Sequence, residues 1–304
     1  MTIKSSFTAT EPPGINLPAQ PVKHRLSPGA WLLRSSFHYL GLRMPRITAR
    51  IAYWLWFRPG RKQRGGDKSL LFKQAEWIPL KWQGKLVAAY AWGQGSPVLL
   101  VHGWGSSASK LDMLAAALVA TGNRVIAFDA PAHGRSGGSR TNVLEITGVI
   151  LELDRIHGPF AAVVAHSFGG LCTVQAVRQG LRVKRLVCIS APSHFDFTLA
   201  SYGRMLNLPN KVVARLSTLV EEKFGADIWS RMSMHDKPGE ISVPALIIHD
   251  EDDMIVAVAE GECVAAAWPQ ARLLKTNGLG HRRILADEMV IAEVSRFISA
   301  GEEG

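Results

Sequence analysis

Cysteine is scarce in this chain of 304 residues, and none of its three cysteines belongs to a CxxC pair. Cys172, Cys188 and Cys263 are scattered and odd in number. This pattern argues against a disulfide framework and against a structural zinc site built on closely spaced thiolates. It fits a reducing compartment, so we expect the protein to be cytoplasmic.

Long apolar runs and a secretory leader are also lacking. The most apolar stretch near the N-terminus, IAYWLWF over residues 51–57, has seven residues, whereas a membrane-spanning helix needs about 20. The first residues, MTIKSSFTATEPPG, are polar and interrupted by Pro and Gly, unlike a signal peptide. The sequence therefore predicts a soluble or peripheral protein.

Acidic residues are scarce in the first quarter of the chain. Residues 1–75 contain 13 Lys and Arg but only Glu11 and Asp67 as acids, a balance of +11, whereas residues 76–304 contain 22 basic and 23 acidic residues, a balance of −1. The excess behind the net charge of +10 therefore belongs to residues 1–75. We divide the chain into this basic extension and a conventional domain over residues 76–304.

The extension begins with a Pro-rich lead over residues 1–28, continues with two aromatic and basic helical stretches, and ends in a charged linker. The second stretch, residues 46–57, has an apolar stripe at helical spacing formed by Ile47, Ile51, Trp54 and Leu55. Arg46 and Arg50 lie on another side of that helix.

Two interpretations of this amphipathic segment stay open. The simpler one is that the apolar stripe packs on the domain and the arginines are solvated. The other is that residues 30–64 contact an anionic membrane, because basic amphipathic helices with Trp and Phe lie in membrane interfaces. We do not expect nucleic-acid binding, since no recognised motif accompanies the charge.

From about residue 77, continuous apolar strands alternate with helices. The expected strands are a hairpin over WIPLKWQGKLVAAYAWGQG, then those in PVLLV, RVIAFDAPAHGRS, AAVVAHS, RLVCIS, PALIIHD and ARLLKTN. The expected helices are LDMLAAALVATG, TNVLEITGVILELDRIHG, GGLCTVQAVRQG, VAEGECVAAAWP and ADEMVIAEVSRFISA. This alternation predicts an α/β fold with a mostly parallel sheet covered by helices on both faces.

One strand runs directly into a serine, in AAVVAHSFGG. A tight strand-to-helix turn needs small residues two before and two after the serine, and Ala165 and Gly169 meet that need around Ser167. This is the small-x-Ser-x-Gly form of a nucleophile elbow, with alanine where glycine is usual. The helix that begins at Phe168 points its N-terminal N–H groups at the reacting carbonyl.

A serine hydroxyl needs a base that removes its proton, and that base needs an acid that orients it. His281 lies in TNGLGHRRIL, on a glycine-flanked loop after the last strand. The segment IIHDEDDMIV follows the penultimate strand and supplies four acidic residues, at positions 250–253. The resulting order along the chain, Ser then Asp then His, is typical of α/β-hydrolases.

Five motifs now stand in one order: VLLVHGWG, FDAPAHGRS, AHSFGG, IIHDEDDMIV and GLGHRRIL. From about residue 77 to residue 300 the chain resembles the α/β-hydrolase fold family. In that family the acidic motif usually reads Gly-x-x-Asp, and here Asp250 replaces the glycine. The resemblance implies Asp253 as the acid, with Asp252 as the main alternative and Asp196 as a third.

The resemblance also implies an oxyanion hole made by main-chain N–H groups of Trp104, in the HGWG turn, and Phe168. It implies a small helical cap at residues 191–243, between the strands that carry the serine and the acid. Apolar residues in this insertion suggest an apolar approach to the serine: Phe195, Phe197, Leu199, Met205 and Leu206. They favour an acyl or aryl ester substrate.

We expect no metal and no organic cofactor. The remaining histidines lack a compact ligand spacing such as HExxH, and positions 250–253 lack the spaced ligands of a calcium loop. We expect His102 to anchor the oxyanion loop, and His133, His166 and His249 to have structural partners.

The sequence thus predicts a serine hydrolase that cleaves a carboxylic ester or thioester through an acyl-enzyme. Acyl transfer, C–C bond hydrolysis and cofactor-free haloperoxidase chemistry use the same fold. A serine in the elbow argues against the dehalogenase and epoxide hydrolase branches. From another class, a membrane-associated binding or scaffold protein without turnover would explain the basic N-terminus.

Overall fold

The computed structural model describes residues 27–60 and 69–300. Most of the Pro-rich lead and the charged linker over residues 61–68 lie outside the described residues, so the predictions made for them are not addressed below.

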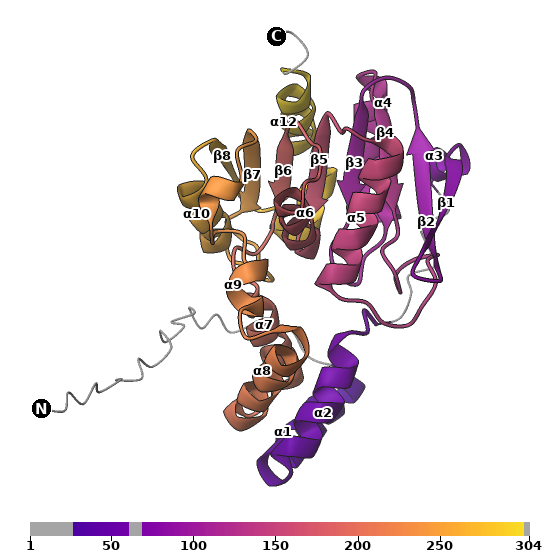
Figure 1. The fold of residues 1–304 in the computed structure, drawn as a ribbon. Coiled ribbons are helices and arrows are strands. Elements are labelled where there is room, and N and C mark those ends of the chain that lie inside the picture. Colours follow the sequence, from indigo (N-terminus) through magenta and orange to yellow (C-terminus); the bar gives the residue numbers. More distant parts are fainter. Residues whose placement is uncertain (1–26, 61–68, 301–304) are drawn as a thin grey trace, which may run out of the picture.

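An eight-stranded sheet forms the centre of the domain, in the order β1-β2-β4-β3-β5-β6-β7-β8 (Figure 1). Its strands are β1 (Glu76–Trp82), β2 (Lys85–Trp92), β3 (Pro97–Val101), β4 (Arg124–Phe128), β5 (Ala162–His166), β6 (Leu186–Ile189), β7 (Ala245–Asp250) and β8 (Ala271–Thr276). The strands from β3 to β8 are parallel, whereas β1 and β2 form the predicted hairpin and β2 pairs antiparallel with β4. Gln83 and Gly84 both have positive φ, 45° and 76°, as a type I′ turn requires.

Helices cover both faces of the sheet. One face packs against α5 (Val143–His157), α6 (Phe168–Arg178) and α10 (Val258–Ala267). The other packs against α4 (Asp112–Ala120) and α12 (Glu288–Ser299), with α3 (Leu70–Lys73) near the hairpin. The β-branched and leucine-rich strands β3 to β7 are buried from both sides, so the prediction of a mostly parallel, two-sided α/β sheet is confirmed.

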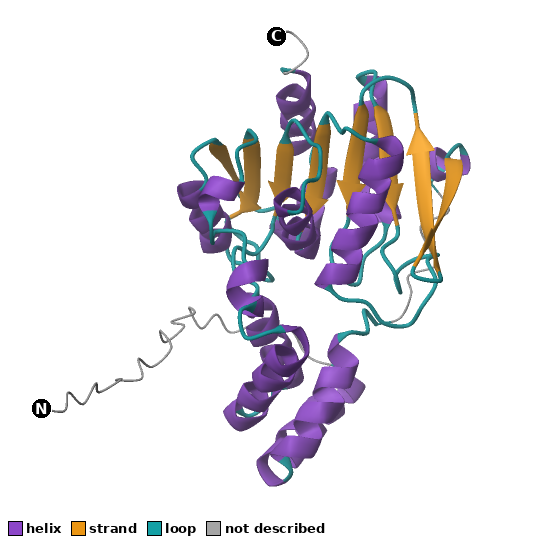
Figure 2. Cartoon of the chain, in the orientation of Figure 1, coloured by secondary structure: helices purple, strands orange, loops and turns teal. Residues whose placement is uncertain are grey.

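Short helices complete the chain: α9 (Ile228–Met232), α11 (Gly280–Arg283), and the 3₁₀ turns η2 (Ala108–Leu111), η3 (Pro238–Glu240) and η4 (Ile284–Ala286). The insertion between β6 and β7 forms α7 (Asp196–Leu206), α8 (Asn210–Phe224) and α9. In Figure 2 these helices lie below the carboxyl ends of the parallel strands, where a cap would cover the serine.

The N-terminal helices α1 (Pro28–Arg43) and α2 (Pro45–Trp56) lie beside α7 and α8 (Figures 1 and 2). Together the four helices share a hydrophobic core separate from the two cores of the sheet. Its buried members are Phe37, Ala49, Ala52, Leu199, Leu206, Leu208, Val212 and Leu216. The N-terminal helices and the cap insertion therefore form one helical group beyond the carboxyl ends of the strands (Figure 1).

The packing face of α2 is not the face that the apolar stripe predicts. Ile47, Ile51 and Trp54 are 45%, 41% and 42% exposed, while Ala49 and Ala52 are fully buried. The small side chains let α2 approach α8 closely, and Ile47 and Ile51 face away from that contact. Leu55 is the member of the stripe that packs against the shared core. The expectation that the stripe packs on the domain is wrong for Ile47 and Ile51. The ring of Trp54 does contact the domain, because the guanidinium of Arg140 lies 4.6 Å from its centroid.

Among the described residues, no helix combines the length and apolar character needed to cross a bilayer.

Candidate active site

Ser167 stands at a sharp turn between β5 and α6. Its φ of 52° and ψ of −126° are strained for a residue with a side chain, and its N–H donates to the carbonyl of Ile189 at 2.9 Å. The turn is crowded: a Cβ added to Gly169 would lie 2.7 Å from the carbonyl oxygen of Val101. Small residues are therefore required where the sequence places them, and the serine is lifted above the strand end.

His281 lies between Ser167 and Asp253. Its Nε2 is 3.1 Å from the Oγ of Ser167, and its Nδ1 is 2.7 Å from the Oδ2 of Asp253. The carboxylate can only accept, so Nδ1 carries the proton and Nε2 is left to accept from the serine hydroxyl. The three residues come from the ends of β5, β7 and β8, which meet at one edge of the sheet.

The carboxylate of Asp253 is completely buried. Burial would raise its pKa, but the hydrogen bond from His281 and the N–H groups of Val256 and Ile255 hold the pKa below its usual value. The side chain is therefore an anion at neutral pH. Such a charge can orient the imidazole through its Nδ1–H group.

The two alternative acids lie elsewhere. Asp252 accepts the N–H of Gly278 at 3.0 Å, and Asp196 begins α7 in the cap. The described hydrogen bonds of the His281 ring run to Ser167 and Asp253 and to neither alternative.

Asp250, which stands where the family usually has glycine, has a role that the motif did not suggest. Its carboxylate accepts from the N–H groups of Gly280 at 2.8 Å and Leu279 at 3.1 Å, and from the hydroxyl of Thr276 at 2.7 Å. Burial would raise its pKa, but these donors hold the pKa below the usual value. Asp250 thus ties the loop of the acid to the loop of the histidine.

The loop after β3 lies against the serine on its other side. A Cβ on Gly103 would approach the Cβ of Ser167 to 2.9 Å, and the rings of Trp104 and Phe168 meet edge-on at 5.2 Å. The two residues expected to supply oxyanion N–H groups therefore flank the serine. The role of their main-chain N–H groups as oxyanion donors stays a prediction.

Two histidines anchor this loop. The Nε2 of His102 accepts the N–H of Ala130 at 3.0 Å, and its Nδ1 donates to the carbonyl of Gly103 at 2.7 Å. The Nε2 of His133 accepts the N–H of Gly105 at 3.0 Å. Burial lowers the pKa of His102 to about 4, so this anchor stays neutral at physiological pH.

The other neighbouring histidines also have structural partners. His166 donates from Nε2 to the main-chain carbonyl of His281 at 2.9 Å, which holds the base in place. Burial, with help from the nearby His281, lowers the pKa of His166 to about 3. His249 donates to the carbonyl of Val256 at 2.8 Å.

A cleft of about 1740 Å³ leads to the serine. Phe195, Phe197 and Met205 line it as the insertion sequence suggests, but Leu199 and Leu206 pack in the core of the cap. The sequence analysis missed a further contribution to the wall, from the end of α2 and the loop after it: Trp56, Phe57, Arg58, Pro59 and Gly60. Only the packing of α2 on the cap brings that segment to the site.

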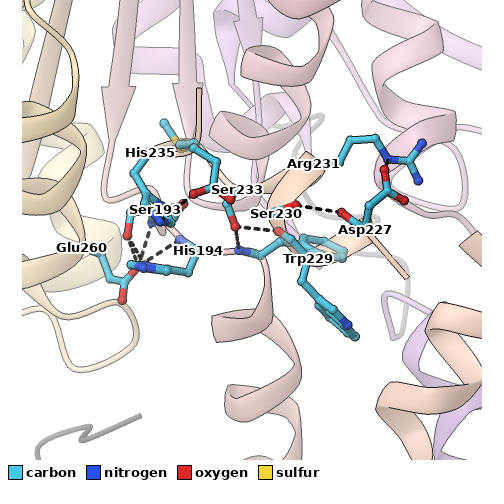
Figure 3. Close-up of polar contacts among 12 residues, drawn as sticks. Ser193, His194, Asp227, Trp229, Ser230, Arg231, Ser233, His235 and Glu260 are labelled. Atoms are coloured by element: carbon cyan, nitrogen blue, oxygen red, sulfur yellow. Dashed lines mark hydrogen bonds and ion pairs between the residues drawn. The ribbon is translucent and has the colours of Figure 1, made fainter. Parts of the chain in front are cut away.

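A second polar cluster joins the start of the cap insertion to α10 (Figure 3). Glu260 accepts from the N–H and hydroxyl of Ser193, both at 2.7 Å. The contact with Glu260 raises the pKa of His194, whose ring lies 3.9 Å from the ring of His235. The cluster fastens one end of the cap to the sheet domain.

Within the described residues, His194, His235 and Cys263 form a group with one metal-ligand atom each, all within 4.8 Å of one another. Zinc bonds of about 2.0–2.3 Å in a tetrahedron require ligand atoms roughly 3.3–3.7 Å apart. The Nδ1 atoms of His194 and His235 already make hydrogen-bond contacts, with Glu260 at 3.4 Å and with the carbonyl of Ser193 at 3.1 Å, so we assign the group no metal. It lies apart from the described hydrogen bonds of Ser167 and His281.

Comparison with known proteins identifies the family. Residues 98–294 match the model of the alpha/beta hydrolase family. Because the match spans more than half of the chain, the protein belongs to this family. The match begins at residue 98, so α1 and α2 lie outside it.

Among curated relatives, a non-heme haloperoxidase of Rhodococcus erythropolis is 27% identical, over 69% of this chain and 94% of its own length. Among solved structures, an esterase from Rhodococcus sp. ECU1013 is similar with a TM-score of 0.56 and 20% identity, covering 74% of this chain and 98% of that one. Alpha/beta hydrolase domain-containing protein 10 from mouse has a TM-score of 0.60 at 16% identity, covering 75% and 99%. At these identities the structural likeness shows the fold.

Proposed function

We propose that this protein is a serine hydrolase that cleaves a carboxylic ester, or a thioester, through an acyl-enzyme. The observation that carries the proposal is the hydrogen-bonded series from Ser167 through His281 to Asp253, at 3.1 and 2.7 Å. These distances lie in the range in which a base can accept a proton from its nucleophile.

The reaction follows from these contacts. The Nε2 of His281 accepts the hydroxyl proton while the Oγ of Ser167 bonds to the carbonyl carbon. The negative charge on the carbonyl oxygen is stabilised by the N–H groups of Trp104 and Phe168. His281 then gives the proton to the departing alcohol as the ester C–O bond breaks. Water, deprotonated by His281, releases the acid and restores the serine.

The walls of the cleft support an apolar acyl or aryl group. Phe195, Tyr202 and Phe224 from the cap face the same cleft as Trp56 from α2. The cleft exceeds the roughly 300–1,000 Å³ of common small-molecule sites. It has room for a long chain beside the reacting ester.

Hydrolysis of a chain-length series of p-nitrophenyl esters tests the proposal. We expect turnover that is lost in Ser167→Ala and retained in Ser299→Ala, an exposed serine on α12. A fluorophosphonate should label the wild type and Ser299→Ala but not Ser167→Ala. Adding an alcohol acceptor and identifying the products by mass spectrometry separates hydrolysis, which gives the free acid, from acyl transfer, which gives a new ester.

Absence of both turnover and labelling would contradict the proposal. It would favour a binding or scaffold protein that keeps the fold without catalysis. Labelling without turnover would mean that the nucleophile reacts while the substrate is of another class.

A further inference from the structure

The helices α1 and α2 carry large apolar side chains on the surface that faces away from the cap core. We define the α1–α2 patch by Trp31, Leu32, Tyr39, Leu42, Ile47 and Ile51, which are between 41% and 69% exposed. Soluble monomers rarely leave extended apolar surfaces uncovered, and those that do use them for binding. We therefore expect the patch to bind a partner.

The charge beside the patch indicates what that occupant is. Residues 27–60 contain no Asp or Glu. Arg43, Arg46 and Arg50 are exposed on the same two helices, and no ion pair joins any of them to a described carboxylate. A second copy of the chain would bring the same positive charge to the contact and be repelled. An anionic lipid surface satisfies both the arginines and the tryptophan and tyrosine rings, which favour the membrane interface.

The patch is held rigidly to the cap. Arg34 on α1 donates to the carbonyls of Arg204 and Met205 at 2.8 and 2.6 Å, at the end of α7. On α2, the carbonyl of Ala52 accepts the hydroxyl of Tyr202 at 3.0 Å. A surface that binds α1 and α2 is thereby held at a fixed position relative to the cap.

The same helices border the candidate active site. Arg34 lines the cleft that reaches Ser167, and so does the segment after Trp56. Lining residues that are also exposed mark the rim of the cleft. Three of them are large and apolar, Met205 (57%), Met254 (56%) and Ile255 (52%). The rest of the exposed rim includes polar and charged residues: Lys110, Arg204, Asn207, Glu251, Asp252 and Arg282. The apolar part of the rim offers a contact for the apolar chain of an entering ligand.

We propose that the α1–α2 patch docks on an anionic lipid surface and that the substrate is a lipid-soluble, long-chain ester that enters the cleft from that surface. The substrate class rests on the proposed serine hydrolase function, whereas the docking does not. Apolar side chains of the patch enter the headgroup boundary while Arg43, Arg46 and Arg50 meet lipid phosphates. The ester then reaches Ser167 along the wall shared by α2 and the cap.

Sedimentation of the full chain with vesicles tests the docking. One vesicle set is phosphatidylcholine alone, and the other contains about a third phosphatidylglycerol. We expect the wild type to sediment with the anionic set, at least about tenfold more than with the neutral set, and to be released by added salt. The triple variant Trp31→Ser, Leu42→Ser, Ile47→Ser should lose this binding about tenfold or more.

A control variant that also replaces exposed apolar residues by serine is Leu70→Ser with Met289→Ser, which are 75% and 72% exposed and lie outside α1 and α2. It should sediment like the wild type. Arg43→Gln with Arg46→Gln and Arg50→Gln should weaken binding to the anionic set and remove most of its salt dependence.

Hydrolysis by the same variants tests the entry of the substrate. All of them should hydrolyse water-soluble p-nitrophenyl butyrate at the wild-type rate, which also shows that they fold. The patch variant should lose about tenfold or more of its rate on a long-chain ester embedded in anionic vesicles. If the patch variant hydrolyses the long-chain ester in vesicles at the wild-type rate, the entry route is overturned.

Other outcomes separate the docking from the hydrolase proposal. A wild type that binds neither vesicle set, or a patch variant that binds as well as the wild type, would overturn the docking even if the ester is hydrolysed. Vesicle binding without any ester hydrolysis would leave the docking supported and the hydrolase proposal contradicted. A dimer that the patch substitutions dissociate would assign the patch to self-association and overturn the lipid proposal.

Discussion

The Oδ1 of Asp250 accepts the N–H of Gly280 at 2.8 Å, one residue before His281. The same carboxylate accepts from the hydroxyl of Thr276 and the N–H of Leu279 through its other oxygen. Asp250 touches neither Ser167 nor the ring of His281, so it is a positioning residue. It fixes the distance between the two loops that supply the candidate acid and base.

Replacing Asp250 by Asn should lower kcat about tenfold or more with little change in KM. An amide has a single acceptor oxygen, so it leaves some of the donors around position 250 facing an NH₂ group. The loop of His281 then shifts, and a shift of about 1 Å at a reacting group can cost roughly a hundredfold in rate. Kinetics on a soluble ester, with the pH profile of kcat/KM, measure the effect.

A merely structural role for Asp250 would lower the melting temperature and leave kcat of the folded fraction unchanged. Asp252→Asn is the matched control, since Asp252 makes a single hydrogen bond to Gly278 at the surface of the same loop.

Asp253→Asn should lower kcat by about 10³–10⁴. The amide would present a donor or a neutral acceptor to the Nδ1 of His281, which now donates to a buried carboxylate at 2.7 Å. The preferred tautomer of the base would change, and its charged form would lose its partner. The kcat of Asp252→Asn should stay within about threefold of the wild-type value. A large loss of kcat in Asp252→Asn but not in Asp253→Asn would identify Asp252 as the acid.

The sequence was sufficient to predict the elements that carry the candidate chemistry. Around Ser167 the turn tolerates only small neighbours, and the candidate acid and base follow β7 and β8 in the sequence. Such features are local, because they depend on backbone geometry within a few residues. Their convergence followed from the shared edge of a parallel sheet.

Features that depend on distant packing escaped the sequence analysis. Ala49 and Ala52 are buried because α8, more than 150 residues further along the chain, packs against them. The spacing of the large apolar residues in α2 therefore predicted the wrong packing face. The grouping of His194, His235 and Cys263 likewise joins three separate segments. Neither contact has a sequence spacing that would reveal it.

Acidification should destabilise the protein well above the pH at which carboxylates titrate. Burial lowers the pKa of His102 to about 4 and that of His166 to about 3, so in this pH range the unfolded chain binds protons that the folded protein does not. Stability is therefore full above pH 6.5 and falls as the pH drops toward the folded pKa values. Between pH 7.5 and 5, each histidine should cost about 2 kcal/mol of unfolding free energy.

Urea unfolding at several pH values measures this loss. His102→Asn should flatten the dependence, because it removes one of the two groups. His194→Gln should steepen it: the pKa of His194 is raised by Glu260, so its protonation on acidification favours the folded state. A dependence that neither substitution changes would mean that other groups control acid stability.

Gly169→Ala should destabilise the protein by about 1–3 kcal/mol. The added Cβ would lie 2.7 Å from the carbonyl oxygen of Val101 and 2.8 Å from that of His102, and main-chain atoms within the sheet cannot move aside cheaply. Gly29→Ala, where no atom lies within 4 Å, should stay within about 0.5 kcal/mol. Thermal unfolding measures the melting temperature of both variants. Equal melting temperatures would show that the turn can accommodate the added methyl group.

Deletion of residues 1–58 should destabilise the cap although Ser167, His281 and Asp253 all lie outside the deleted segment. The core shared with α1 and α2 would open, and Leu199, Leu206 and Val212 would be exposed to water. Exposing buried aliphatic side chains costs about 1.5–3 kcal/mol each. Even partial exposure should lower the melting temperature by roughly 6 °C or more in a protein of this size.

Two neighbouring point variants test whether the fall in melting temperature comes from lost packing between α2 and the cap. Ala52→Asp places a charge on the fully buried face of α2, whereas Ile51→Asp places the same charge on a side chain that is 41% exposed. Ala52→Asp should reproduce most of the fall in melting temperature, because an unpaired buried carboxylate is costly. Ile51→Asp should melt close to the wild type. Equal melting temperatures for the two variants would mean that α2 does not pack on the cap through its alanine face.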